Sequence, residues 1–125
     1  MRDEGSSTVE FTLVSVLLLG LFLAVLQLGF VLHTRNVLVA SAQEGARYGA
    51  NADRGTADAR ERTREVVSTA LSTSVADRMR YEAEQVVRDG VVTVEVTVRG
   101  PLPLVFLPAG PLSLTVRGHA LEEAR

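Results

Sequence analysis

The chain begins with a long stretch that carries no charge. After a short polar start, residues 11–32 contain only uncharged side chains, most of them Leu, Val and Phe. At about 1.5 Å per residue, a helix of this length covers about 33 Å, which matches the hydrocarbon core of a bilayer. A helix with no polar face over about six turns needs a large protein around it if it is to be buried in a soluble fold. The pattern therefore predicts a membrane-spanning helix.

A cleaved secretory signal is the main alternative for this stretch. Such signals have a shorter apolar core, roughly 7–15 residues, and end in a small-x-small cleavage site. Residues 32–35 read Leu-His-Thr-Arg and offer no such site. The flanking charges do not fix the orientation of the helix, because Arg2 is partly offset by Asp3 and Glu4 while arginines also follow the stretch.

The remaining chain shows first helical and then strand periodicity. Helical character continues to Ala50, and a cluster of Asn, Asp and Gly over 51–55 predicts an end. Thr56 can cap a second helix, whose apolar positions recur at helical spacing from 59 to 75. Period-two alternation near 79–88, 92–99 and 112–117 predicts three antiparallel strands, with Asp89-Gly90 as a type I′ turn between the first two. The sequence thus predicts an α+β domain in which a small sheet covers helices.

Composition restricts the chemistry that this chain can perform. Its 125 residues carry a net charge of −2, which gives no electrostatic basis for binding nucleic acid. Cysteine is absent, which excludes disulfides and thiolate chemistry. The two histidines, His33 and His119, are too few and too far apart in sequence to suggest a metal site. No nucleophile triad, zinc-protease motif, P-loop or dinucleotide fingerprint occurs, so we expect no enzyme activity, no cofactor and no metal.

Small residues form a regular stripe just after the apolar stretch. Ser41, Gly45 and Gly49 recur every four residues and so share one helix face. Small side chains at this spacing let another helix or a sheet approach closely. The alternative is a surface of Ala and Gly with no packing role.

An apolar segment rich in proline lies between the second and third predicted strands. All four prolines fall within residues 100–111, and they prevent a regular ladder there. The segment nevertheless contains Leu104, Val105, Phe106 and Leu107. Two interpretations remain open: these side chains contact the bilayer surface or a partner, or they fold back over the open end of the core.

Two parts of the N-terminal region together resemble a known family. Gly5, followed by Val9-Glu10-Phe11 and the apolar helix, resembles a class III prepilin signal of the type IV pilin superfamily. The tract Ala42-Gln-Glu-Gly-Ala-Arg-Tyr-Gly-Ala50 is similar to that of TadE-like pseudopilins, in the tight-adherence (Tad/Flp) branch. The chain departs from the family in its leader, where two acids follow Arg2. Phe11, where Flp major pilins tend to have Tyr, favours the pseudopilin branch.

The resemblance implies a cytoplasmic leader that a prepilin peptidase removes between Gly5 and Ser6. It also implies that Glu10 and Phe11 belong to the assembly interface, with Glu10 pairing to the new α-amine of a neighbouring subunit and setting its register. The alternative for Glu10 is an interfacial carboxylate near a helix N-terminus, where the helix dipole favours it.

The expected organisation has three parts: a leader over 1–5, a pilin-like helix over 6–54 that spans the membrane at about 11–32, and an extracytoplasmic α+β domain over 55–125. The resemblance implies a minor pilin or pseudopilin of a tight-adherence pilus or a related type II/IV secretion assembly. Such a protein is single-pass in the plasma (inner) membrane, with a cytoplasmic N-terminus, and sits in or at the base of a pilus. Its expected partners are the peptidase, other pilins and pseudopilins, inner-membrane platform proteins and the lipid bilayer, and not nucleic acid. A signal-anchored accessory or binding protein that is never processed is the alternative.

Overall fold

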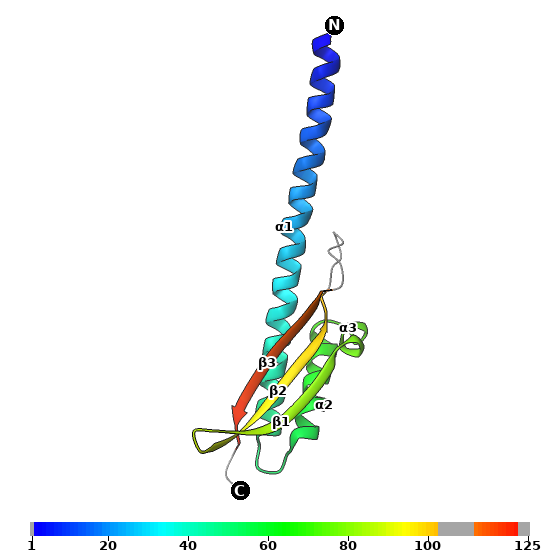
Figure 1. Cartoon of the computed structure of the whole chain (residues 1–125). Helices are drawn as coiled ribbons and strands as arrows, with labels where there is room; N and C mark the ends of the chain where they lie inside the picture. The colour runs from blue at the N-terminus through cyan, green and yellow to red at the C-terminus, as the bar shows by residue number, and fades with distance from the viewer. Residues whose placement is uncertain (1, 103–111, 123–125) are drawn as a thin grey trace.

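A long N-terminal helix dominates the fold. The structure, a computed structural model, describes residues 2–102 and 112–122, with side chains from Gly5 onward. Helix α1 runs without a break from Arg2 to Gly49, and the remaining elements gather around its C-terminal part (Figure 1). Two helices and a three-stranded antiparallel sheet follow it along the chain. The prediction of an α+β fold with a long N-terminal helix is therefore confirmed.

The second helical region is divided into two helices, α2 (Thr56–Ala70) and α3 (Thr73–Arg78). Ser72 separates them, because its hydroxyl accepts a hydrogen bond from the amide of Val75 at 3.1 Å and so caps α3. The single helix expected over 59–75 is therefore interrupted.

The start of α2 also differs from the expected cap. Gly55, and not Thr56, is the N-cap residue. Its amide donates to Oδ2 of Asp58 at 2.9 Å, so a carboxylate in the first turn satisfies the amide at the helix start. The expectation that Thr56 caps this helix is wrong, because Asp58 fixes the boundary one residue earlier.

The sheet is a simple meander of β1 (Arg80–Arg88), β2 (Val91–Pro101) and β3 (Ser113–Leu121), in that order. Asp89 and Gly90 join the first two strands with φ angles of 52° and 79°. Two successive positive φ values are typical of a type I′ turn, as predicted from the Asp-Gly pair.

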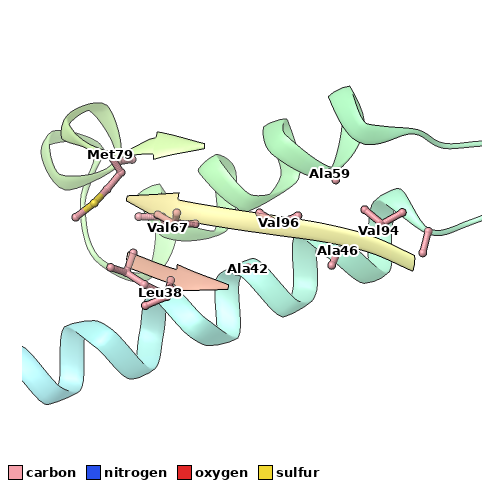
Figure 2. Close-up of a cluster of buried hydrophobic side chains, with 12 residues drawn as sticks. Leu38, Ala42, Ala46, Ala59, Val67, Met79, Val94 and Val96 are labelled. Atoms are coloured by element: carbon pink, nitrogen blue, oxygen red, sulfur yellow. The ribbon is translucent and has the colours of Figure 1, made fainter. Parts of the chain in front are cut away.

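The core lies between one face of the sheet and the helices α1 and α2. The inward residues of β2, Val94, Val96 and Val98, are at most 1% exposed. Figure 2 shows the buried cluster extending from Leu38, Val67 and Met79 at one end to Ala46, Ala59 and Val94 at the other. Most of these side chains are small, so the helices approach the sheet and each other closely.

The β1–β2 hairpin extends past the end of this core (Figure 1). Val87 and Val92 face each other across the hairpin, on the face that carries the buried valines, yet they are 70% and 40% exposed. Strand periodicity placed them on the apolar face but could not show that the helices end before reaching them.

Candidate functional site

The N-terminal half of α1 carries a large apolar surface that the domain leaves open. Between Val9 and Leu32, most of the Val, Leu and Phe side chains are 40–75% exposed. Keeping this surface in water costs about 25 cal/mol per Å², whereas a bilayer removes the cost. The helix is long and apolar enough to cross a membrane. We call residues 5–32 the stem, and its properties fit a single-pass membrane protein.

The predicted processing and assembly residues lie at the free end of the stem. Gly5 and Ser6 are exposed, and a Cβ added at Gly5 would meet no atom within 4 Å. Glu10 is exposed beside Phe11, which is 75% exposed. Among the residues that the structure describes, Glu10 has no ion-pair partner. Within the part of the chain that the structure describes, this carboxylate is thus uncompensated where the apolar surface begins.

Gly5 lies inside α1 and not before it. A protease needs an extended backbone, so cleavage there requires the first turns of the helix to unwind. Glycine helps, because it costs a helix about 1 kcal/mol relative to alanine and helix ends open easily. The residue is therefore accessible without any rearrangement of the domain.

The small-residue stripe contacts α2 of the same chain. A Cβ at Gly49 would lie 2.5 Å from Cβ of Ala59, and one at Gly45 would overlap the Thr63 hydroxyl and lie 2.8 Å from the Ala59 carbonyl oxygen. Ser41 is buried at 1% exposure. The structure therefore packs Gly45 and Gly49 of this stripe against α2 of the same chain, with Ser41 buried as well.

The apolar residues 104–107 lie outside the described residues. The structure therefore does not bear on the two interpretations given for Leu104, Val105, Phe106 and Leu107. The strands beside this segment are described, and the amide of Leu102 donates to the carbonyl of Leu112 at 3.0 Å. Leu112 is 47% exposed, so apolar surface is already present where these strands end.

An aromatic and cationic cluster fastens the turn between α1 and α2, and sequence reasoning missed it. The guanidinium of Arg54 lies 4.5 Å from the ring centre of Tyr48, and its Nη1 donates to the phenol oxygen at 2.5 Å. Arg62 lies 5.7 Å from the same ring and pairs with Glu44 at 3.5 Å and with Glu65 at 3.1 Å. Cation–π contacts of this kind contribute about 0.5–1 kcal/mol at exposed sites. The cluster stabilises the domain, and nothing in it suggests catalysis.

Tyr81 connects the start of β1 to α3. Its hydroxyl donates to the carbonyl of Ala76 at 2.9 Å. Burial raises the pKa of Tyr81 above 10.0, with the nearby Arg64 opposing the shift and Asp77 adding to it. Because the folded pKa exceeds the unfolded one, stability from this group is complete below about pH 10 and is lost as pH rises through the folded pKa.

We expect Tyr81→Phe to change the alkaline stability profile. At neutral pH the variant should lose about 1 kcal/mol with the hydrogen bond. Above pH 10 its thermal midpoint should fall less steeply than that of the wild type, because no buried phenol must ionise. Tyr48→Phe is the control and should keep the steep fall. Parallel profiles for Tyr81→Phe and wild type from pH 8 upward would show that Tyr81 does not govern the alkaline loss.

The comparison with known families concerns this same N-terminal region. The family of TadE-like proteins matches residues 5–47. This part of the chain is TadE-like. The match begins at Gly5, includes Glu10 and the whole stem, and ends within the helix that packs against α2 and the sheet. No curated protein and no solved structure matches the chain.

The TadE-like match indicates a pilin-like protein associated with the Tad pilus. Proteins of this family are structural pilus components, which agrees with an exposed stem and a small domain. Among the described residues, no group of three or more His, Asp or Glu side chains could hold a metal ion.

Proposed function

We propose that this chain is a minor pilin or pseudopilin of a Tad pilus, or of a related type II/IV secretion assembly. The observation that carries the proposal is the TadE-like stem itself. Most Val, Leu and Phe side chains between Val9 and Leu32 are exposed, although Gln27 is buried, while the same helix continues into the core as its central element. A separate tether would not need to be rigidly continuous with the domain that it holds.

In this proposal the N-terminus is cytoplasmic and the stem lies in the plasma membrane. The domain lies outside, where it meets other pilins or pseudopilins, while platform proteins contact the membrane-embedded part. Because α1 has no break between Gly5 and Gly49, movement of the stem along the membrane normal moves the domain with it. A subunit of this kind can transmit assembly forces without performing chemistry.

Glu10 has a specific role in the proposed assembly. Removal of residues 1–5 creates an α-ammonium group at Ser6, four residues before the carboxylate. An intramembrane carboxylate needs a partner, and a neighbouring subunit's α-ammonium supplies one of opposite charge. The pair would set the axial register between two stems, while Phe11 and the following apolar residues pack side by side.

The test of processing is an intact-mass measurement of protein extracted from membranes after co-expression with a prepilin peptidase. The wild type should lose residues 1–5. Gly5→Arg should retain them, because a long charged side chain blocks close approach of the backbone to the enzyme, while the fold is unchanged since Gly5 touches nothing. Ser7→Arg adds the same charge two residues beyond the cut and should still be processed.

An unprocessed, signal-anchored accessory protein is the second candidate. It predicts that all three chains keep residues 1–5 in the presence of active peptidase, each with the full-length mass of its own sequence. That result would reject the pilin proposal and retain only the membrane anchor.

A further inference from the structure

The end of the domain nearest the stem carries exposed arginines without partners. Arg78 ends α3, and Arg80 and Arg99 are directly opposite each other on β1 and β2. All three are exposed, and none makes an ion pair or hydrogen bond within residues 5–102 and 112–122. We call Arg78, Arg80 and Arg99 the proximal arginines.

The nearby acids do not neutralise this group. Asp77 pairs with Arg64 on α2. Glu82 lies one row farther along β1, opposite Thr97, and forms no ion pair in the described part of the chain. Two like charges directly opposite each other across strands destabilise a sheet. The Arg80–Arg99 pair is therefore unfavourable in the isolated chain and would be relieved by an external anion.

The geometry of the fold places this group close to the membrane surface. Figure 1 shows α3 and the adjoining ends of β2 and β3 directed toward the stem, with the β1–β2 turn at the opposite end. Gly118 of β3 touches Ala42 of α1, and Thr115, which pairs with Arg99, lies three residues nearer the stem. The three strand residues from Gly118 to Thr115, at about 3.3 Å each, cover the length of at most about seven residues of α1 at about 1.5 Å each.

The Arg99 row therefore lies no nearer the stem than about residue 35 of α1. The apolar stretch ends at Leu32, so the row lies at least about 5 Å beyond it. The head-group layer of a bilayer is about 5–7 Å thick on each side of the hydrocarbon core. Arginine suits phosphate at this depth, because its planar guanidinium can donate two parallel hydrogen bonds to phosphate oxygens.

We propose that the proximal arginines bind the phosphates of anionic phospholipids and hold the domain against the membrane that α1 spans. This inference rests on the proposed function only in that α1 crosses a bilayer, and it requires neither leader cleavage nor assembly. The occupant is the lipid head-group layer of the same membrane. An acidic surface of a sister subunit would also pair with arginines, but it would have to enter that layer to reach them.

The experiment uses the full chain in lipid nanodiscs. The chain has no cysteine, so Ser113→Cys, at the exposed start of β3, provides a single site for a fluorophore. Discs contain phosphatidylcholine alone or a mixture with phosphatidylglycerol, and a nitroxide on some lipid head groups quenches the fluorophore when the domain is docked. We expect stronger quenching with phosphatidylglycerol, reduced by high salt because salt screens surface charges.

The test variant is Arg80→Ser with Arg99→Ser. Removing two arginines near an anionic surface should lower the ratio of docked to free domain about 30-fold, or about fivefold for each. The control, Arg47→Ser with Arg60→Ser, makes the same charge change on exposed residues nearer the opposite end of the domain and should quench like the wild type. The test variant should melt no lower than wild type in detergent, since it removes a repulsive pair.

Four results would overturn the proposal. Equal quenching of the wild type in both discs would exclude an anionic lipid, and unchanged quenching of the test variant would exclude the proximal arginines. Quenching that follows the number of copies per disc, and not the phosphatidylglycerol content, would point to a protein partner. A chain that enters neither disc overturns the membrane-spanning stem as well, which separates failure of the function from failure of the docking.

Discussion

Gly118→Ala is expected to lower the free energy of unfolding of the domain by about 3 kcal/mol, at the upper end of the usual cost of overpacking. The new Cβ would lie 2.5 Å from the carbonyl carbon of Ala42 and 2.8 Å from its oxygen, and it would also overlap the amide of Gln43. These are backbone atoms in the middle of a helix, so no side-chain rotation can relieve the contact. Either β3 or α1 must move, and both border the same core.

Chemical denaturation in detergent micelles, with a signal from the sheet, measures this loss. His119→Ala is the matched control, because it changes the next residue of the same strand on the exposed, outward face. The control should stay within about 0.5 kcal/mol of wild type, as is usual for surface substitutions. A Gly118→Ala variant as stable as the control would show that α1 and β3 do not approach as closely as the structure places them.

The sequence predicted the elements of this fold well where the signal is local. The charge-free stretch predicted the stem, strict alternation over 92–99 predicted β2, and Asp89-Gly90 predicted a turn that has the two positive φ angles expected. Each of these depends on a few neighbouring residues and on the period of the element that they form.

The features that the sequence could not predict depend on which elements of the fold contact each other. Gly118 sits inside a strand pattern, a position that suggests close approach of another backbone, but only the fold shows that Ala42 is the neighbour. Val87 follows the apolar alternation and is nevertheless exposed, because the covering helices end short of it. The opposed Arg80 and Arg99 are nineteen positions apart and meet only through the hairpin register.

The difference between local sequence patterns and contacts in the fold also affects the small-residue stripe and the stem. From sequence, Ser41, Gly45 and Gly49 could either let another helix or a sheet approach closely or form a surface with no packing role. The structure places Gly45 and Gly49 against α2, with too little space for even a methyl group. In the proposed assembly, lateral contacts would then involve the stem or the outer surfaces of the domain. Within the stem, Glu10 is the only carboxylate, which makes it the most informative residue to change.

Glu10→Gln is expected to weaken association of processed subunits at least about thirtyfold. Removing one partner of a buried charge pair costs about 2–5 kcal/mol, because the other charge is left without compensation. Here the remaining charge would be the α-ammonium of Ser6 on the neighbouring stem. Glutamine keeps the size and the hydrogen-bonding capacity of the side chain, so the effect reports the charge. The measurement is the yield of crosslinked oligomers in membranes that contain active prepilin peptidase.

The effect on membrane insertion should have the opposite sign, which makes the experiment decisive. An ionised side chain is costly to place in the hydrocarbon core and glutamine carries no charge, so Glu10→Gln should insert at least as well as wild type. Thr12→Val, a change of similar size on the same exposed helix, should leave the oligomer yield unaltered. If Glu10→Gln oligomers instead form at the wild-type level, the carboxylate serves only the dipole at the helix start, and axial register must come from the apolar packing of the stems. A loss of oligomers with full processing and full membrane insertion indicates a contact between subunits, because the anchor itself has become easier to place in lipid.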